Sequence, residues 1–459
     1  MISNASTIST VEANTTPLIN PIDSTNPSNL SREMQPALWQ CGTYSMGSLF
    51  HWDPINRINL NMFRTLPPTA APIPFRDLLS GVFSALSNNG AGSKFKDQIQ
   101  EYFKVKHVFL VSSGKAALYL TLKAMEQTSN RKKVIIPAYS SFCLASAVAR
   151  SGLSIKLCDI DPETLDFDLA QLKSMVTEKT LAVIPVHNYG LVCNLKEIKK
   201  IAVEKGAYVV EDAAQAAGAL FGDRKVGTIG DIGILSLGRG KNICTLGGGV
   251  ILSDKESLAR WIGESIKKYP QESVVSDLGS FVSGMALSFL LNPESYTIPS
   301  NLPFLNLGAN IFDPNFEIYR FPNLKGEIGK KTFLYLDKYN EIRIQNARLL
   351  NDSLAGNSKL KIPKQNHNGR SVYLRFPILL PTKETRDHVF QKLSQQRLGA
   401  SRSYPTSLNE IIGFRKYLDD EVEFPGARFV AERILTLPTH PYVREDDIQK
   451  MISIINKIT

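Results

Sequence analysis

The sequence is poor in cysteine and histidine, and neither residue is clustered as metal ligands or disulfide partners would be. Five cysteines and six histidines are spread over 459 residues, with no CxxC pair and no histidine at ligand spacing from a cysteine. Zinc sites and disulfide-rich domains depend on such clusters. We therefore expect no metal and no disulfide framework, and the scattered thiols are typical of a cytoplasmic protein.

Basic residues are absent from the first part of the chain. No Lys or Arg precedes Arg32, and Ser, Thr, Asn and Pro are abundant there. A stretch with so few apolar residues buries too little surface to fold, so residues 1–33 are predicted to form a disordered tail, followed by an N-terminal extension over 34–75. The tail also lacks the basic start and apolar core of a signal peptide.

The chain has no block of Lys and Arg interleaved with aromatic residues, although its formal net charge is +10. Nucleic acid is therefore not an expected partner. Two interpretations of the positive charge stay open: a solvated basic surface, or an attraction to anions such as phosphorylated ligands and acidic lipid heads.

Charge is almost missing from Leu278 to Phe312, where Glu294 is the single ionised residue. The apolar run before Pro293 would be a helix of about 22 Å, which is shorter than the ~30 Å hydrocarbon core of a membrane. We predict an apolar insert over 268–320. One interpretation is a buried subdomain or dimer contact. The other is an interfacial hairpin or a lid over an apolar substrate, with peripheral membrane contact through 278–312.

What the sequence does contain is a regular alternation of short apolar runs and helix-like segments. Val, Ile and Leu fill most runs on both faces, as in strands that are covered on both sides. This pattern predicts an α/β fold with a mostly parallel seven-stranded sheet, and the short link between the last two runs favours one antiparallel strand. The runs are 108–113, 133–138, 154–161, 181–190, 207–215, 232–237 and 248–253, and the helical segments are 115–127, 140–151, 167–176 and 194–205.

The pattern changes near residue 320. We predict a large domain over 76–320, which contains the insert, and a smaller C-terminal α+β domain over 321–459. The smaller domain is expected to contain one long helix, one strand and two further helices. Their ranges are 324–354, 371–380, 385–396 and 445–458.

Polar residues follow several of the predicted strands, and ligands of such sheets bind beyond the carboxyl ends of the strands. Asp212 ends a buried strand, and Ser236 and Lys241 follow the next one. The stretch "SSGK" (112–115) leads into a helix whose N-terminal amides suit a phosphate. Pyridoxal 5′-phosphate needs all of these groups, because it has a phosphate, a ring nitrogen that pairs with a carboxylate and an aldehyde that forms a Schiff base with lysine. Lys241 must be unprotonated to react, so we expect its pKa to be depressed.

These motifs resemble the DegT/DnrJ/EryC1/StrS family of pyridoxal-phosphate sugar aminotransferases, which have fold type I. The likeness rests on "VSSGKAALYLTLKAM", "VIIPAYSSFCLASAVARSG", "LCDIDPETLDFD", "LAVIPVHNYG", "VVEDAAQAAGALFGDRKVGTIGDIGILSLGRGKN", "GGGVIL" and the C-terminal "LTLPTHPYVREDDIQKMISII". The resemblance implies a homodimer that transfers an amino group, often from glutamate, to a nucleotide-linked keto-sugar. The products of such enzymes serve cell-surface polysaccharide or secondary-metabolite biosynthesis.

The resemblance also implies a role for each matching residue. Lys241 would hold the cofactor and act as the acid and base of the reaction, and Asp212 would pair with the pyridine nitrogen. Gln215 would lie near the ring hydroxyl. Ser236 and the backbone of Gly114 and Lys115 would bind the phosphate.

Several positions depart from the family pattern. Lys115 stands where the family has Thr or Ser, so either its side chain or the backbone alone contacts the phosphate. The aromatic residue that stacks on the ring falls at Ser141, and Tyr139 or Phe142 are the candidates to replace it.

Three further residues are candidate substrate contacts. They are His187, which follows a strand, and Arg402 and Tyr404 in "GASRSYP". A structural role stays open for each of them.

Two other functions remain possible on this sequence. The insert favours another pyridoxal-phosphate reaction on an apolar or lipid-linked substrate, and a non-catalytic regulator would keep the fold and the cofactor without turnover. The family's sugar dehydratases replace the lysine by histidine, so Lys241 argues against that branch.

Overall fold

The structure is a computed structural model that describes residues 64–78, 90–271, 290–297, 311–418 and 422–459, with positions 279, 282 and 286. The predicted tail and most of the predicted insert lie outside the described residues. The chain divides into two units, Met1–Ile58 and Asn59–Thr459. The described residues all belong to the second unit, in which the domain boundary near residue 320 stays a prediction.

A seven-stranded sheet with the order β1-β9-β8-β5-β4-β2-β3 forms the centre of the larger part of this unit. Strand β9 is antiparallel to both of its neighbours, and the remaining pairs are parallel. The mostly parallel sheet and its antiparallel strand are thereby confirmed. The strands are β1 (His107–Val111), β2 (Lys133–Pro137), β3 (Ser154–Cys158), β4 (Thr180–Val183), β5 (Tyr208–Asp212), β8 (Ile232–Ser236) and β9 (Gly249–Ser253).

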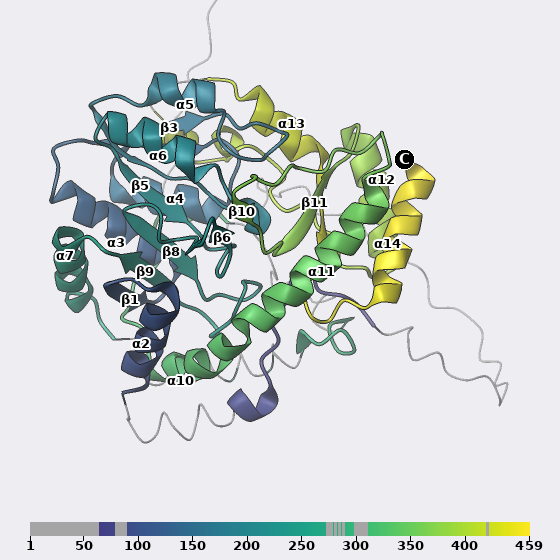
Figure 1. Cartoon of the computed structure of the whole chain (residues 1–459), viewed down its shortest axis with the longest axis horizontal. Helices are drawn as coiled ribbons and strands as arrows, with labels where there is room; N and C mark the ends of the chain where they lie inside the picture. Colours follow the sequence, from purple (N-terminus) through teal and green to yellow (C-terminus); the bar gives the residue numbers. More distant parts are fainter. Residues whose placement is uncertain are drawn as a thin grey trace, which may run out of the picture. The chain divides into compact units, whose positions relative to one another are not determined.

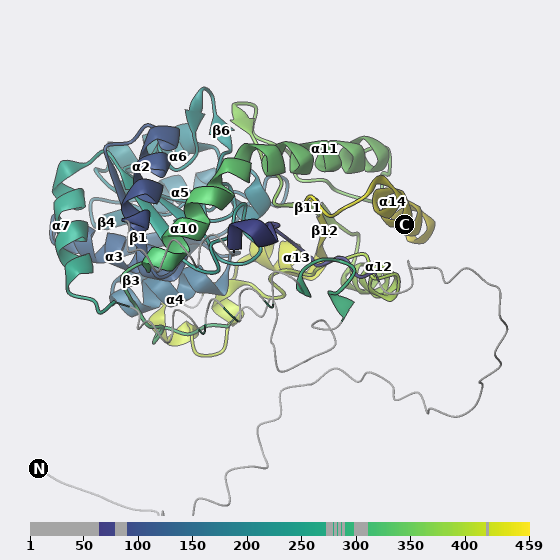
Figure 2. The same cartoon turned by 90° about the horizontal axis from the view of Figure 1, so that it is seen from below.

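Helices cover both faces of this sheet (Figure 1). Figure 2 shows α3 and α4 on one face and α5 and α6 on the other. Because both faces are covered, consecutive residues of the inner strand β2 are all buried, with Val134, Ile135 and Ile136 at most 1% exposed. The helices are α2 (Ala91–Phe103), α3 (Gly114–Glu126), α4 (Phe142–Ser151), α5 (Leu169–Met175), α6 (Leu195–Glu204) and α7 (Glu256–Lys267).

Side-chain caps fix where α3 and α4 start. The hydroxyl of Ser113 accepts a hydrogen bond from the amide of Ala116 at the start of α3, and Ser141 does the same for Cys143 at the start of α4. A cap of this kind satisfies an amide that has no partner within the helix. Part of the polar sequence after each strand therefore begins the next helix.

The smaller part contains the antiparallel pair β11 (Arg375–Leu379) and β12 (Ile434–Pro438), which packs with helices into a second core. These helices are α11 (Leu336–Leu354), α12 (Lys383–Gln395) and α14 (Glu445–Ile458), whereas the buried residues of α13 (Pro425–Arg433) join the core of the larger part. In Figure 1, α11 runs diagonally across this part, with α12 and α14 beside it. None of the described helices is long and apolar enough to cross a bilayer.

The prediction of one helix over 324–354 was wrong. A 3₁₀ turn at Phe333–Tyr335 separates α10 (Asn323–Thr332) from α11. The physical reason is that the two halves pack on different partners: a Cβ on Gly329 of α10 would lie 2.5 Å from the ring of Phe95 in α2, while α11 packs on β11. The predicted strand 371–380 is also shorter than expected, beginning at Arg375.

A segment that we call the N-terminal strap (64–74) runs along the smaller part and reaches the loop that carries Lys241. Arg64 pairs with Asp447 at 2.7 Å, and the ring of His440 contacts the carbonyl of Pro67 at 2.8 Å. Further along, the hydroxyl of Thr69 donates to the carbonyl of Gly240 at 3.0 Å.

Arg343 of α11 is fully buried and joins the strap to the same loop. Its guanidinium donates to the carbonyl of Ala70 at 3.0 Å and to that of Asn242 at 3.2 Å. It also donates to the Asn340 side chain at 3.1 Å. Burial lowers the pKa of Arg343 to about 9, and no described carboxylate lies within ion-pair distance. The Arg343 side chain thus holds the Lys241 loop by a hydrogen bond to a backbone carbonyl, without an ion pair.

The tightest packing of the sheet gives a stability prediction. A Cβ on Gly233 of β8 would lie 2.0 Å from the carbonyl oxygen of Gly227, whereas one on Gly356 would meet nothing within 4 Å. Gly233→Ala should lower the free energy of unfolding by about 3 kcal/mol or more, because backbone must move. Gly356→Ala should change it by less than about 1 kcal/mol. Equal urea midpoints of unfolding for the two variants would show that the close contact at Gly233 does not affect stability.

Candidate active site

The carboxyl ends of β5 and β8 bring together the residues that the sequence singled out. Asp212 is the last residue of β5 and Ser236 the last of β8, and the two strands pair in parallel. The loop after β8 carries Lys241, and the N-terminus of α3 contributes Gly114. We call these residues — Gly114, Asp212, Ser236 and Lys241 — the strand-end site.

Lys241 and Asp212 lie close enough for each charge to act on the other. Burial lowers the pKa of Lys241, and the nearby Arg375 lowers it further, while Cys143 and Asp212 oppose the shift. Burial likewise raises the pKa of Asp212, against the amide of Ala214 and the charge of Lys241. Both residues keep some accessible surface. The lowered pKa shifts the amine toward its neutral form, which is the form that a nucleophilic lysine requires.

One end of the strand-end site is a close contact between α3 and β8. A Cβ on Gly114 would lie 3.3 Å from the Cβ and 3.5 Å from the hydroxyl of Ser236. The glycine therefore lets the hydroxyl approach the first amides of a helix, where a positive dipole end and free N–H groups favour an anion.

The side chain of Lys115 is turned away from this contact. Its ammonium lies 3.8 Å from the carboxylate of Asp313 and 4.7 Å from the centre of the Phe316 ring. Of the two interpretations of Lys115, this geometry favours the backbone amide as the anion contact.

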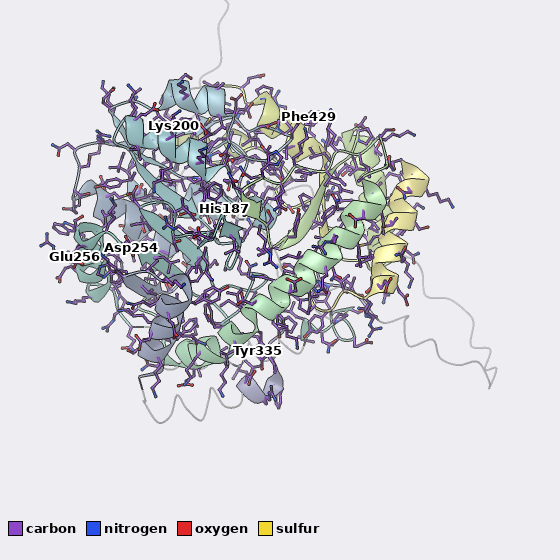
Figure 3. The ribbon with its side chains drawn as sticks, viewed as in Figure 1. His187, Lys200, Asp254, Glu256, Tyr335 and Phe429 are labelled. Atoms are coloured by element: carbon purple, nitrogen blue, oxygen red, sulfur yellow. The ribbon has the colours of Figure 1, made fainter. Side chains whose placement is uncertain are left out.

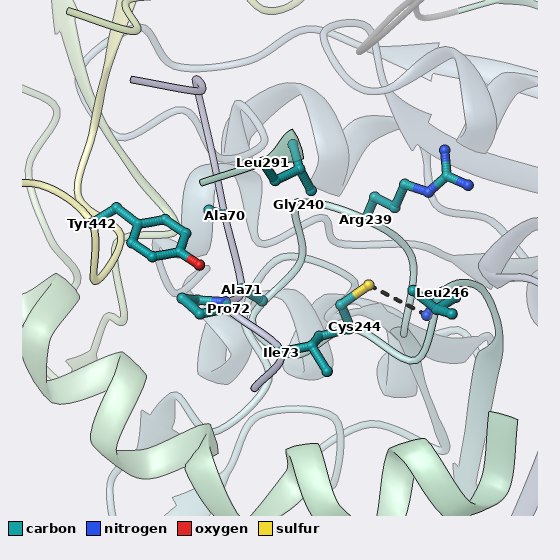
Figure 4. A pocket seen from close by; sticks show the side chains of 10 residues that line it. All are labelled: Ala70, Ala71, Pro72, Ile73, Arg239, Gly240, Cys244, Leu246, Leu291 and Tyr442. Carbon is teal, nitrogen blue, oxygen red and sulfur yellow. Dashed lines mark hydrogen bonds between the residues drawn. The ribbon is translucent and has the colours of Figure 1, made fainter. Parts of the chain in front are cut away.

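The loop of Lys241 is pressed against the strap. Gly240 has φ of +72°, and a Cβ there would lie 2.5 Å from the methyl group of Thr69. A cavity of about 10 Å³ remains between the loop, the strap and Leu291, which is room for about one water (Figure 4). The amine is therefore carried by a loop with little space to move.

Three buried tyrosines join the two parts of the unit beside the strand-end site. The hydroxyls of Tyr139 and Tyr189 are 2.7 Å apart, and the ring of Tyr404 stacks on Tyr189 with centroids 6.0 Å apart. Gln215 donates to the Tyr404 hydroxyl at 3.0 Å and accepts from the Tyr189 amide at 3.2 Å. Burial raises the pKa of Tyr404 to about 12, so its hydroxyl stays protonated at neutral pH.

The other two expected substrate contacts already have partners within the protein. His187 has no exposed surface: the amide of Cys193 donates to its Nδ1 at 3.1 Å, Glu211 approaches its Nε2 at 3.6 Å, and its own amide donates to the carbonyl of Asp212 at 3.1 Å. Figure 3 shows it within the fold. Arg402 pairs with Asp387 of α12 at 3.3 Å and lies over the ring of Phe390. A substrate role for His187 or Arg402 stays a prediction.

Sequence reasoning missed three residues that lie near Lys241 or Tyr404. They are Arg375, Cys143 and Tyr189. Arg375 begins β11, inside an apolar run that predicted only a strand. Arginine is rarely found in a buried apolar run without a specific partner, so the position of Arg375 was the signal available in the sequence. For Cys143 the sequence offered no comparable signal, since a single thiol at a helix start is uninformative.

Part of the predicted insert reaches the same region. The carbonyl of Pro293 accepts from the amide of Thr65 in the strap at 2.9 Å, and the hydroxyls of Thr65 and Thr297 are 2.7 Å apart. Tyr296 is buried near Arg375, whose charge acts on its hydroxyl. Residues 290–297 are therefore anchored on the strap, close to the strand-end site.

Pyridoxal 5′-phosphate fits this set of groups. Gly114 and Ser236 form a cradle that a side chain at 114 would fill, and a phosphate suits it. Asp212 would supply the carboxylate for a protonated ring nitrogen, and Lys241 would supply the amine, whose pKa is lowered by burial.

Comparison with known proteins gives the same answer. The model of the DegT/DnrJ/EryC1/StrS aminotransferase family matches residues 84–456. A GDP-perosamine synthase of Caulobacter vibrioides is 27% identical over 369 residues, which are 80% of this chain and 89% of that protein. A pleiotropic regulatory protein of Geobacillus stearothermophilus is 29% identical over 364 residues, 78% of this chain and 87% of that protein.

A solved structure shares the fold. Escherichia coli GDP-4-keto-6-deoxy-D-mannose-3-dehydratase with bound hydrated PLP has a TM-score of 0.69 and 21% identity, covering 86% of this chain and 100% of that one. The family match spans most of the chain, from the start of the larger part to the last helix. The chain therefore belongs to the DegT/DnrJ/EryC1/StrS family of pyridoxal-phosphate-dependent aminotransferases.

Proposed function

We propose that the chain transfers an amino group from glutamate to a nucleotide-linked keto-sugar, in the synthesis of an amino sugar for a cell-surface polysaccharide or a secondary metabolite. The observation that carries this proposal is the mutual electrostatic effect of Lys241 and Asp212 beside the Gly114–Ser236 cradle. The GDP-perosamine synthase relative supports a nucleotide sugar as acceptor. Lys241 stands where the dehydratases of the family carry histidine, which supports amino transfer.

Each residue of the site has a distinct task in this proposal. The cofactor supplies an aldehyde that takes up the amine and a ring that accepts negative charge. Lys241 would hold it and would then carry a proton at Nζ between the two carbons that flank the transferred nitrogen. Asp212 keeps the ring nitrogen protonated, and Ser236 with the amides of Gly114 and Lys115 binds the phosphate.

The tyrosines and Gln215 complete the proposed site. Gln215 is positioned by its hydrogen bonds to Tyr404 and Tyr189, and we propose that its amide lies near the ring hydroxyl. Tyr404 is the proposed substrate contact from the smaller part. Tyr139 is the proposed aromatic neighbour of the cofactor, since its buried ring meets that of Tyr404 edge-on at 5.7 Å.

We also propose that the chain acts as a cytoplasmic homodimer and touches membranes through residues 278–312. The membrane contact is supported by the scarcity of charge in that segment and by Val282, which is 54% exposed. The anchored residues 290–297 favour a second role for the insert as a wall of the active site.

Borohydride reduction tests the proposed function directly. Reduction of the cofactor-loaded protein should fix the cofactor to Lys241, as read by peptide mass spectrometry. Lys241→Ala should remove the adduct and lower amino transfer by about 10²- to 10⁴-fold, because the proton carrier is lost. Lys205→Ala, which changes an exposed lysine paired with Glu178, should behave as wild type. Adducts on other lysines alone would contradict the proposal.

The pKa shift of Lys241 can be measured without the cofactor. Formaldehyde with a reducing agent methylates only neutral amines, so labelling of Lys241 should begin at lower pH than labelling of surface lysines. Asp212→Asn removes an anion that raises the pKa, so the midpoint should move to lower pH. Arg375→Gln removes a cation that lowers the pKa, so the midpoint should move to higher pH. Shifts in the same direction would refute this electrostatic arrangement.

Flotation with anionic liposomes tests the membrane contact. Val282→Asp should reduce the bound fraction several-fold and leave borohydride fixation unchanged, because a buried carboxylate is costly in a bilayer interface. Val203→Asp is the matched control, since Val203 is 59% exposed on α6. Equal flotation of both variants and wild type would argue against the contact.

A further inference from the structure

Arg375 is placed next to the active site by the way β11 docks on the larger part. The amide of Val372 donates to the carbonyl of Gly190 at 3.0 Å. A Cβ on Gly190 would lie 2.8 Å from the backbone nitrogen of Leu374 and 3.1 Å from the carbonyl oxygen of Gln215. The strand therefore starts against the turn that carries Tyr189, and Arg375 is its first residue.

The guanidinium of Arg375 is tethered beside Tyr404. Its Nη1 donates to the hydroxyl of Ser403 at 3.1 Å, and this hydroxyl also contacts that of Thr436 at 3.0 Å. Ser403 has φ of +51°, a conformation that non-glycine residues adopt rarely. The next residue, Tyr404, is bonded to Gln215. Arg375 is thus positioned by the same short segment that carries the tyrosine.

No described carboxylate lies within ion-pair distance of Arg375, in contrast to Arg64 and Arg386, which pair with Asp447 and Asp387. The charged group on which Arg375 acts is instead the amine of Lys241, and it also acts on the hydroxyls of Tyr189 and Tyr404. Arg375 remains only partly buried. Two positive groups at one site repel each other, so an anionic ligand would stabilise the arrangement.

The chemistry of the reaction identifies this anion. The phosphate of the cofactor is assigned to the other end, at Gly114 and Ser236. The α-carboxylate of an amino acid is bonded to the same carbon as the amine that is transferred, so it must lie within a few bonds of Lys241. The diphosphate of a nucleotide sugar is separated from the reacting carbon by the sugar ring. A planar guanidinium also matches a carboxylate through two parallel hydrogen bonds.

We infer that Arg375 binds the carboxylate of the amino donor, tethered by Ser403 beside Lys241. The inference rests on the proposed amino transfer and adds to it a donor subsite built from the smaller part. It assigns to Arg375 a role in donor recognition in addition to its effect on the pKa of Lys241.

The test separates the two half-reactions of the loaded enzyme. Arg375→Gln should raise the glutamate concentration for half-maximal conversion of the cofactor spectrum by about 30-fold or more. The reverse half-reaction with the amino-sugar product should keep its concentration dependence. Glutarate has carboxylates but no amine, and its binding can be measured by the rise in melting temperature that it causes. Arg375→Gln should weaken the binding of glutarate as well. Arg375→Lys should recover part of the affinity for glutamate. Lysine keeps the positive charge, but it cannot form the two parallel hydrogen bonds of a guanidinium.

Controls separate this inference from the proposed function. Arg370→Gln, which alters an exposed arginine paired with Glu341, should leave every constant unchanged. Borohydride fixation to Lys241 should persist in Arg375→Gln; its absence in wild type would overturn the proposed function itself. Unchanged glutamate dependence in Arg375→Gln would overturn the inference. A loss confined to the sugar-nucleotide half-reaction would also overturn it, by assigning Arg375 to the diphosphate.

Discussion

The mutual electrostatic effect of Lys241 and Asp212 is the constraint on which the account depends. Burial lowers the pKa of Lys241 and raises that of Asp212, so it disfavours the charged form of both groups. A ligand that bonds to the amine and brings a protonated nitrogen to the carboxylate relieves both costs. Pyridoxal 5′-phosphate would do both, which is why we propose Lys241 and Asp212 as part of its binding site.

The rest of the structure keeps this pair in place from three sides. Thr69 of the strap and Arg343 of α11 hold the loop on either side of Lys241 through its carbonyl groups. The sheet fixes Asp212 at the end of β5, and Tyr404 brings the smaller part to Gln215. A reactive amine needs this support, because its position relative to the reacting carbon decides the rate.

Sequence patterns predicted the sheet, its helices and the residues at the strand ends, since these depend on local periodicity and on motifs. They missed features that depend on distant contacts. The break before α11 follows from two packing partners, and Arg343 lies on the buried face where an apolar residue is usual. The contacts of His187 with Cys193 and of Arg402 with Asp387 are likewise not recognisable from spacing, and the substrate role of both residues stays a prediction.

A crystal structure of the protein with pyridoxal 5′-phosphate tests the central claim most directly. Continuous electron density should join Lys241 Nζ to the aldehyde carbon of the cofactor, with an oxygen of Asp212 about 2.7–2.9 Å from the ring nitrogen. A ring bound elsewhere, or a ring attached to Lys241 whose nitrogen faces away from Asp212, would contradict the account.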